Sequence, residues 1–389
     1  MYFIQTRNNI APKGLAELPA QQFAVNSGAE SDVQGILVRS AAMHDTPLPE
    51  GLLAIARAGA GVNNIPVPAC SEKGIVVFNT PGANANAVKE LVLAGLLLAS
   101  RDIIGGVEWA KGLKPGETSV AKQVEKGKGQ FVGPEIQGKT LGVMGLGAIG
   151  VLVANAAEAL GMKVIGYDPF LSVDNAWALS RSIQRSNSLE ALLEQSDYVT
   201  IHIPLSDKTR NMIDESMLAK MKPSAALLNF SRAELCDGKA VAAALAAGKL
   251  RRYVVDFPTE DVLNAPGVIA IPHLGASTPE SEDNCADMAA KQTRDYLMTG
   301  SIRNSVNLPA CELAPAEKHR ISVIHKNVPN MISQIAAVMG QANVNIEHMV
   351  NRSRGDIAYT VVDSLDDVPA DIAQALSAIE GVVRARSIC

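Results

Sequence analysis

The chain has 389 residues, 47% of them hydrophobic and 19% charged, and a formal net charge of −5. That balance is typical of a soluble globular protein with two or three domains, since a single core rarely grows beyond about 250–300 residues. It argues against a nucleic-acid partner, because the chain has no net positive charge and no dense run of Lys and Arg.

Other global features exclude further classes. The most apolar stretch, residues 91–99, is too short to cross a bilayer, and the start, MYFIQTRNNIAPKG, lacks the apolar core of a secretory signal. The five cysteines are scattered without a C-x-x-C pair, so we expect neither a disulfide framework nor a metal site. Together these features predict a cytoplasmic protein with no membrane partner.

The first third of the chain alternates strands and helices. Strands are expected within residues 36–38, 52–58 and 75–78, with helical stretches around them. This βαβα order predicts a parallel sheet with helices on both faces. Residues 84–110 suggest one long, apolar, buried helix, and the polar, Gly-rich residues 111–138 suggest a loop.

The most informative local stretch is residues 140–168, TLGVMGLGAIGVLVANAAEALGMKVIGYD. An apolar strand leads into Gly145, Gly147 and Gly150 in the spacing G-x-G-x-x-G, and an Ala-rich helix and a second strand follow. Such glycines permit a tight turn, the approach of a pyrophosphate and close packing of the helix on the strand. The free N–H groups at the helix start favour phosphate. The pattern predicts a dinucleotide-binding turn.

Asp168 ends the second strand, 18 residues after Gly150. Its carboxylate can accept hydrogen bonds from both ribose hydroxyls of the adenosine half. The same charge repels the 2′-phosphate of NADP, and the residues directly after it, Pro169, Phe170 and Leu171, offer no Arg to neutralise one. NAD is therefore the predicted cofactor.

The alternation continues after residue 168. Strands are expected at 198–203, 226–230, 252–257 and 268–271, an Ala-rich helix at 239–247, and a long helix at 273–300 that begins after Ser277, Thr278 and Pro279. Residues 301–317 suggest a linker. The remaining residues predict the order βαββαβ, with strands at 321–325, 345–351, 357–362 and 382–386 and helices at 331–341 and 370–379, typical of a ferredoxin-like sandwich.

Polar residues follow several of the later strands. Arg232 follows the strand at 226–230, Asp256 and Glu260 are assigned to the end of the strand at 252–257, and His273 follows the strand at 268–271. Parallel strands place these ends at one edge of the sheet. His273 suits acid–base work near neutral pH, Glu260 could orient it, and Arg232 could bind a carboxylate through its two-pronged guanidinium. Considered alone, His273 could instead be a structural histidine, and Arg232 could instead form a surface ion pair.

The segments ARAGAGVNN, FNTPGANANAVKE, GLGAIG, GYDP, HIPL, NFSRAELCDGKA, VDFPTE and PHLGAST resemble the D-isomer-specific 2-hydroxyacid dehydrogenases. The resemblance runs from about Gly35 to the C-terminus. It implies a fold in which a Rossmann-type, doubly wound NAD domain (residues 94–273) is inserted in a flavodoxin-like substrate domain (1–93 and 274–310). Residues 311–389 would be a linker and a βαββαβ ACT domain, and the fold class is α/β throughout.

The resemblance also implies a role for particular residues. The catalytic residues would be Arg232, Glu260 and His273. The substrate would be bound by Arg39, Arg57, Ala60 and Gly61, in a turn that begins at Gly59, with Arg57 as the main phosphate ligand because Arg recognises phosphate bidentately. The cofactor-binding residues would be Gly145, Gly147, Ala148, Ile149, Gly150, Asp168, Pro204, Ser231 and Asp256, with Asp256 as the partner of the nicotinamide amide.

Two departures from the family pattern lie near the catalytic residues. Arg232 is followed by Ala233 and Glu234 where the family usually has Gly. The family's D-V-F is shortened to Asp256-Phe257, and only 12 residues separate Glu260 from His273. Both departures bear on the Glu260–His273 geometry, but neither removes a required group.

The tail resembles an ACT domain, whose paired copies often bind amino acids. In the bacterial serine-inhibited enzyme this module carries H-x-N and, further on, an Asn in V-N-I. The matching residues here are His325, Asn327 and Asn345, whose side chains suit a zwitterion, so they are the expected effector-binding residues. Asn330 departs from the family, which usually has Gly there. The alternative is that this domain only mediates dimerisation.

The implied function is the NAD-dependent oxidation of D-3-phosphoglycerate to 3-phosphohydroxypyruvate, the first step of phosphorylated L-serine synthesis. The implied assembly is a homodimer or homotetramer, with L-serine as a possible effector. The rival hypotheses are a dehydrogenase for another 2-hydroxy acid, such as 2-hydroxyglutarate or glyoxylate, and a non-catalytic NAD-sensing protein.

Overall fold

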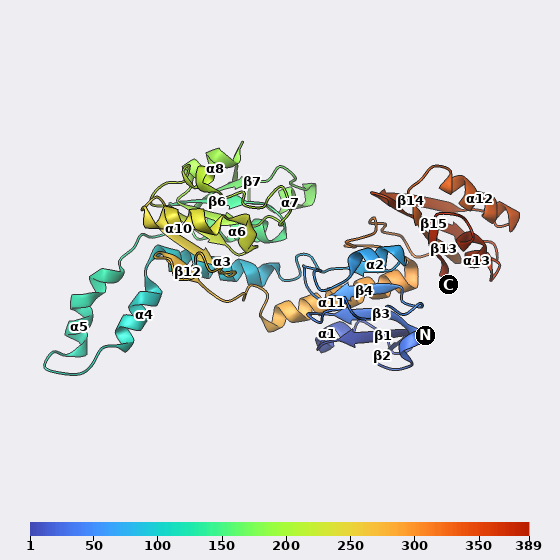
Figure 1. Cartoon of the computed structure of the whole chain (residues 1–389), viewed down its shortest axis with the longest axis horizontal. Helices are drawn as coiled ribbons and strands as arrows, with labels where there is room; N and C mark the ends of the chain where they lie inside the picture. The colour runs from blue at the N-terminus through green and yellow to red at the C-terminus, as the bar shows by residue number, and fades with distance from the viewer. Residues whose placement is uncertain (389) are drawn as a thin grey trace. The chain divides into compact units, whose positions relative to one another are not determined.

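The computed structural model describes residues 1–388, and the chain divides into two compact units. One unit combines Met1–Asn84 with the chain from Pro279 onward, and the other is Ala85–Thr278 (Figure 1). The chain therefore leaves the first unit, builds the second and returns. The three-domain division expected above, with boundaries after residues 93, 273 and 310, stays a prediction.

The first unit contains a five-stranded, fully parallel sheet in the order β2-β1-β3-β4-β5. This is the order of flavodoxin-like sheets. Its strands are β1 (Tyr2–Arg7), β2 (Phe23–Val25), β3 (Val33–Val38), β4 (Ala54–Arg57) and β5 (Val76–Phe78). Helices α1 (Pro12–Leu15) and α11 (Pro279–Thr299) cover one face, and α2 (Val67–Glu72) covers the other.

The second unit contains a seven-stranded parallel sheet in the order β12-β11-β10-β9-β6-β7-β8. The order reverses next to β6, which is where a doubly wound sheet binds its ligand. The strands are β6 (Thr140–Met144), β7 (Lys163–Tyr167), β8 (Gln184–Arg185), β9 (Tyr198–Ile201), β10 (Ala226–Asn229), β11 (Arg252–Val255) and β12 (Val268–Ala270).

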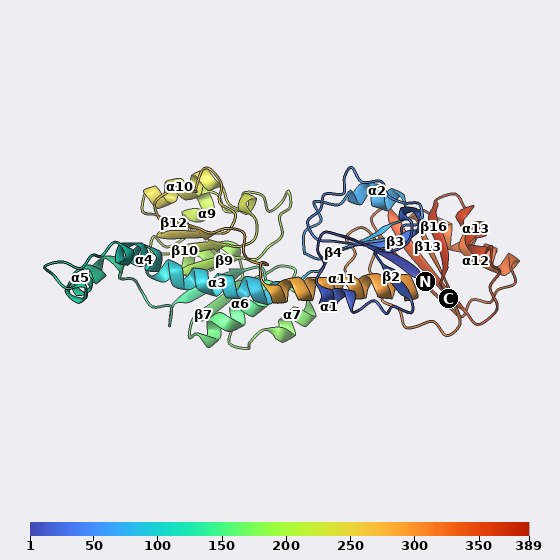
Figure 2. The same ribbon diagram turned by 90° about the horizontal axis from the view of Figure 1, so that it is seen from below.

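Helices cover both faces of this sheet (Figure 2). Helices α3 (Ala85–Ser100) and α6 (Ala148–Ala159) bury their apolar sides on one face, against residues such as Val143 and Leu228. Helices α8 (Leu189–Gln195), α9 (Glu215–Leu218) and α10 (Gly238–Ala246) cover the other face. Because both faces are covered, the central strands are almost wholly apolar.

The prediction of one long helix over residues 84–110 is wrong. Helix α3 ends at Ser100, and α4 (Ile103–Lys111) begins separately, with the Asp102 carboxylate accepting from the Gly105 N–H as an N-cap. A side chain that caps the helix that follows it interrupts the one before it. The loop expected at 111–138 is also partly helical, since it contains α5 (Val120–Gly127) and the short 3₁₀ turn Lys128–Phe131.

The segment expected to be a linker, residues 301–317, packs onto the first sheet. Ser305 forms a bridge with Phe78, the last residue of β5. The Asn307 side chain accepts from the Val77 N–H at 2.9 Å and donates to the Ile75 carbonyl at 2.9 Å. The segment therefore protects the edge strand β5 while it connects two parts of the unit.

The C-terminal part has the predicted order βαββαβ: β13 (His319–Lys326), α12 (Met331–Gln341), β14 (His348–Arg354), β15 (Ile357–Ser364), α13 (Ile372–Ser377) and β16 (Val382–Ile388). Its sheet is antiparallel in the order β14-β15-β13-β16. Helices α12 and α13 pack on one face, and Ile324, Tyr359 and Val361 from the other face join the core around α11.

Within residues 1–388, no helix is long and apolar enough to cross a membrane, and no cluster of His, Cys, Asp and Glu could hold a metal ion. The four described cysteines, Cys70, Cys236, Cys285 and Cys311, are buried and unpaired.

Candidate active site

The glycines of the β6–α6 turn are each required for a different reason. Gly145 has φ +86°, and a Cβ there would lie 2.5 Å from the His202 carbonyl oxygen. A Cβ on Gly150 would lie 2.0 Å from the Gly145 carbonyl oxygen. A Cβ on Gly147 would meet no atom within 4 Å. Two of the glycines thus allow tight packing, and the third leaves open space beside the backbone where a ligand can approach.

Helix α6 begins at Ala148, with Gly147 at the N-cap and no side chain capping the first turn. The N–H groups of the first turn, including those of Ala148 and Ile149, have no partner within the helix. Together with the helix dipole they favour a phosphate group. This end of the helix therefore fits the pyrophosphate of a dinucleotide.

Asp168 lies just after β7, beside this turn. One carboxylate oxygen accepts from the Leu146 N–H at 2.8 Å and the other from the Phe170 N–H at 2.8 Å. The first bond fixes the carboxylate to the glycine turn. Each oxygen keeps a further lone pair with which to accept from a ribose hydroxyl.

The ends of β9 and β10 are joined by Ser231, whose Oγ donates to the Ile201 carbonyl at 2.7 Å. Pro204 follows β9 and is exposed, with its carbonyl accepting from the Thr209 hydroxyl. Both residues, expected to line the cofactor site, thus lie at the carboxyl edge of the sheet.

Arg232, Asp256 and His273 come together at the carboxyl ends of β10, β11 and β12. The His273 ring packs on Phe257 with 4.1 Å between ring centroids, and the Arg232 guanidinium lies 5.4 Å from the centre of the same ring. Arg232 also donates to the Ser231 carbonyl at 2.7 Å. Phe257 therefore supports both the imidazole and the guanidinium.

Asp256 is 1% exposed, and neither of its carboxylate oxygens has a hydrogen-bond partner among the described residues. Burial raises the pKa of Asp256 to about 6, and the nearby positive charge of Arg232 offsets only part of this effect. A buried carboxylate without a donor is costly. It is the kind of group that a ligand's amide N–H would satisfy.

The pKa of His273 is shifted in the other direction. Partial burial lowers it below the usual 6.5, and the nearby positive charge of Arg232 lowers it further. Both causes disfavour the imidazolium ion. The ring is therefore neutral near pH 7 and able to accept a proton.

Glu260 does not join this group. Its side chain is exposed, and no hydrogen bond or ion pair within 4.0 Å links it to His273 in the part of the chain that the structure describes. The other departure from the family pattern is harmless: Ala233 is not among the residues with positive φ, and it starts a 3₁₀ turn, so its Cβ causes no strain.

The predicted substrate residues lie at the carboxyl edge of the first unit's sheet. The Arg57 Nε donates to the Arg39 carbonyl at 2.9 Å, and its Nη1 donates to the Gly61 carbonyl. Gly59 has φ +156°, and the Ala60 carbonyl accepts from the Asn79 side chain at 2.6 Å. The guanidinium of Arg57 is therefore held in a fixed orientation.

The Arg39 side chain forms an ion pair at 2.6 Å with Glu282, near the start of α11, and both side chains are 42% exposed. Sequence patterns did not single out Glu282. Because α11 lies more than 200 residues from β3 along the chain, no local spacing could have revealed this pair.

The three predicted effector residues differ in their surroundings. The His325 ring is 2% exposed, with Nδ1 bonded to the Lys326 carbonyl and Nε2 to the Thr360 hydroxyl, each at 2.8 Å. Since a carbonyl only accepts, Nδ1 carries the proton. Asn327 and Asn345 are exposed. Both nitrogens of His325 are thus already satisfied within the chain.

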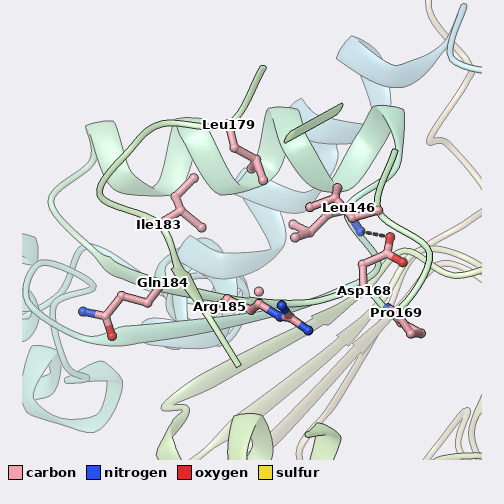
Figure 3. Close-up of a pocket in the computed structure, with 9 residues that line it drawn as sticks. Leu146, Asp168, Pro169, Leu179, Ile183, Gln184 and Arg185 are labelled. Carbon is pink, nitrogen blue, oxygen red and sulfur yellow. Dashed lines mark hydrogen bonds between the residues drawn. The ribbon is translucent and has the colours of Figure 1, made fainter. Parts of the chain in front are cut away.

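A further residue that sequence reasoning missed is Arg185, at the end of β8. It lines the same cavity as Asp168 (Figure 3). Arg185 does not follow Asp168 directly in the sequence but comes from the neighbouring strand β8. The parallel register of β7 and β8, with Gly166 beside Arg185, is what brings it there.

Comparison with known proteins identifies the second unit. Residues 106–275 match the family described as D-isomer specific 2-hydroxyacid dehydrogenase, NAD binding domain. The chain is 32% identical to the D-3-phosphoglycerate dehydrogenase of Escherichia coli K12, over 87% of this chain and 82% of that protein. It is 35% identical to the D-3-phosphoglycerate dehydrogenase of Synechocystis, over 79% of this chain but 53% of that protein.

The chain thus spans about half the length of some of its relatives: it covers 48% of the D-3-phosphoglycerate dehydrogenase of Methanocaldococcus jannaschii, at 38% identity. Among solved structures, NAD⁺-bound 3-phosphoglycerate dehydrogenase of Entamoeba histolytica is similar, with a TM-score of 0.59 and 26% identity, over 79% of this chain and 98% of that chain. A glyoxylate reductase of Paecilomyes thermophila is also similar, with a TM-score of 0.64 and 25% identity, over 78% of this chain and 98% of that chain.

Proposed function

Because the chain belongs to the D-isomer-specific 2-hydroxyacid dehydrogenase family, we propose that it oxidises D-3-phosphoglycerate to 3-phosphohydroxypyruvate with NAD. This reaction is the first step of phosphorylated L-serine synthesis. The observation that carries the proposal is the grouping of Arg232, Asp256 and neutral His273 at one sheet edge, in a chain similar over most of its length to a D-3-phosphoglycerate dehydrogenase.

The residues present fit a dinucleotide. Gly147 and the first turn of α6 would hold the pyrophosphate, and Asp168 the ribose hydroxyls of the adenosine half. The unpartnered, buried carboxylate of Asp256 would accept from the carboxamide of the nicotinamide. When bound, NAD supplies the acceptor for the hydride from C2 of the substrate.

His273 takes the proton of the C2 hydroxyl. Its lowered pKa keeps it neutral, so it can act as a base near pH 7. Arg232 binds the substrate's carboxylate and C2 oxygen, and its fixed positive charge favours the developing negative charge on that oxygen. Glu260 is proposed to orient His273, which requires its exposed side chain to move toward the ring.

Arg57, with help from Arg39, binds the phosphate of the substrate, and the turn at Ala60 and Gly61 offers backbone N–H groups to its carboxylate. The Arg57 guanidinium is oriented by the Arg39 and Gly61 carbonyls. An oriented guanidinium loses little entropy on binding. These contacts make the phosphorylated acid the preferred substrate over an unphosphorylated one.

For the C-terminal part we propose an ACT domain that binds L-serine as a feedback effector. Support comes from the βαββαβ order with the strand order β14-β15-β13-β16 and from exposed Asn327 and Asn345. His325 would contribute by holding the loop after β13, since its ring is bonded to Thr360 and to the Lys326 carbonyl.

We further propose that the protein is a cytoplasmic homodimer or homotetramer. Helices α4 and α5 extend from the seven-stranded sheet's unit as a hairpin (Figure 1), and neither helix buries a residue. Their exposed apolar side chains are Ile103, Ile104, Val107, Val120 and Val124. Apolar surface of this kind marks a contact with another chain, and light scattering on the purified protein measures the assembly.

The function is tested by following NADH oxidation with 3-phosphohydroxypyruvate, 2-oxoglutarate and glyoxylate, each with and without L-serine. We expect the phosphorylated substrate to have the highest kcat/KM and serine to inhibit. Preference for 2-oxoglutarate or glyoxylate would instead support the rival 2-hydroxyacid dehydrogenases. No turnover of any of them, with NADH still bound, would support an NAD-sensing protein, and indifference to serine would remove only the regulatory part.

A further inference from the structure

A cavity of ≈ 330 Å³ opens beside the glycine turn of the second unit. Its apolar walls come from Leu146, Leu179 and Ile183, and its polar groups from Asp168 and Arg185 (Figure 3). The volume is at the lower end of the range for small-molecule sites, roughly 300–1,000 Å³. It suits one part of a dinucleotide rather than the whole.

The negative charge of Asp168 in this cavity is already partly offset by its surroundings. Both oxygens of Asp168 accept from backbone N–H groups, those of Leu146 and Phe170. The start of α6 adds positive partial charge next to the first of these bonds. The repulsion that Asp168 exerts on a nearby anion is therefore weaker than that of a free carboxylate.

The positive charge of Arg185, in the same cavity, is not offset in this way. Arg185 forms no hydrogen bond or ion pair with any described residue, and its side chain is exposed. It pairs in register with Gly166, two residues before Asp168, so its side chain projects from the same face of the sheet as the Asp168 side chain. The guanidinium points along the cavity toward the turn formed by Asp168 and Pro169 (Figure 3).

We propose that Arg185 binds a phosphate on the 2′ oxygen of the adenosine ribose, so that the protein uses NADP(H) as well as NAD(H). An Arg meets a phosphate through two parallel N–H···O bonds. Asp168 serves the ribose hydroxyls of NAD, and Arg185 serves the additional 2′-phosphate of NADP. The inference rests on the dinucleotide-binding part of the proposed function and is independent of the identity of the hydroxy acid.

The test compares two probes that differ only in the 2′-phosphate: adenosine 2′,5′-bisphosphate and adenosine 5′-monophosphate. Their binding to the full chain is measured by calorimetry for the wild type, Arg185→Gln and Arg181→Gln. Arg181 is the matched control, because it is also exposed, comes from the same segment and does not line the cavity.

Arg185→Gln should weaken the bisphosphate about tenfold, as expected for a charge-assisted contact that solvent partly screens. It should change the monophosphate less than about twofold. Arg181→Gln should change neither. The same split should appear in kcat/KM for NADPH and NADH with whichever 2-oxo acid the protein reduces.

Equal weakening of both probes by Arg185→Gln would overturn the inference, as would a wild type that binds the monophosphate but not the bisphosphate. If neither probe binds, the dinucleotide site itself is wrong. If both bind as expected but no 2-oxo acid is reduced, the proposed reaction fails and the assignment of Arg185 stands.

Discussion

The two parallel sheets both carry polar groups at the carboxyl ends of their strands, but they hold these groups differently. In the seven-stranded sheet, the Asp256 carboxylate has no hydrogen-bond partner among the described residues, and the His273 ring packs on Phe257. In the five-stranded sheet, Arg57 is bonded to two carbonyls and Arg39 to Glu282. The carboxyl edge of the seven-stranded sheet (the first edge) therefore has groups with shifted pKa values. The carboxyl edge of the five-stranded sheet (the second edge) has permanently charged groups.

From this difference we infer that the two edges have different roles. Groups whose charge can change suit proton transfer, whereas fixed guanidinium groups suit the binding of a phosphate. Substitutions at the first edge should therefore lower kcat, and substitutions at the second should raise KM.

The largest effect is expected for His273→Asn. Loss of the base should lower kcat about 10²- to 10⁴-fold, while NADH binding, measured by fluorescence titration, stays unchanged. In the wild type, the lowered pKa of His273 predicts that kcat/KM for oxidation is flat above pH 6.5 and falls at lower pH as the ring becomes charged. His348→Asn, at an exposed position on β14, is the control. A kcat for His273→Asn within about threefold of wild type contradicts the assignment.

Arg57→Gln should raise KM for 3-phosphohydroxypyruvate by roughly 10- to 150-fold, corresponding to about 1.5–3 kcal/mol for bonds to a charged group. Its kcat should change much less. Arg57→Lys keeps the charge but loses the two-pronged geometry, so its KM should lie between those of the wild type and Arg57→Gln. Arg7→Gln, which removes an exposed ion pair with Glu30 in the same unit, is the control. A drop in kcat with unchanged KM would mean that Arg57 belongs to the chemical step.

Asp256→Asn should stabilise the protein, and more at pH 8 than at pH 5. The pKa of Asp256, about 6, lies above the ordinary value of 3.8, so the folded chain binds this proton more tightly than the unfolded chain. Protonation of Asp256 therefore stabilises the folded chain. This contribution to the free energy of unfolding is complete below about pH 3.8 and is lost as the pH rises through about 6. The amide removes the ionisation. Melting temperatures across this range measure the difference, and a difference independent of pH would exclude a buried, ionising carboxylate.

The smallest effect is expected for Glu282→Gln. Its ion pair with Arg39 is half-exposed, and such pairs contribute about 0.2–1 kcal/mol. Freeing Arg39 should therefore lower KM for the phosphorylated substrate by up to about fivefold. Measurement over a range of salt concentrations should show the gain shrinking as salt screens the pair. A higher KM would show that Glu282 helps to orient Arg39 rather than competing with the substrate.

Local chemistry made part of this architecture predictable. The spacing of Gly145, Gly147 and Gly150 predicts the dinucleotide-binding turn, because a Cβ at Gly145 or Gly150 would collide with backbone atoms. The strand ends placed Arg232, Asp256 and His273 at one edge, since parallel strands share their direction. The helix Met331–Gln341 and the βαββαβ order of the tail also agree with the sequence pattern.

Other features depend on contacts that the sequence pattern does not encode. Asp102 interrupts an apolar run that otherwise favours one helix, because its side chain caps α4. Arg185 reaches the cavity of Asp168 only through the pairing of β7 with β8. The pairing of Arg39 with Glu282 and the burial of His325 against Thr360 likewise come from segments far apart in the chain. Such contacts require the tertiary fold.

The central claim, that the chain is built to act on a phosphorylated 2-hydroxy acid, is tested most directly by one ratio. This is kcat/KM for 3-phosphohydroxypyruvate divided by kcat/KM for hydroxypyruvate, with NADH, in the wild type and in Arg57→Gln. We predict a wild-type ratio of about tenfold or more, from at least one charged hydrogen bond to the phosphate, which falls toward one in the variant. A wild-type ratio near one, or a ratio that survives the loss of Arg57, would contradict the account.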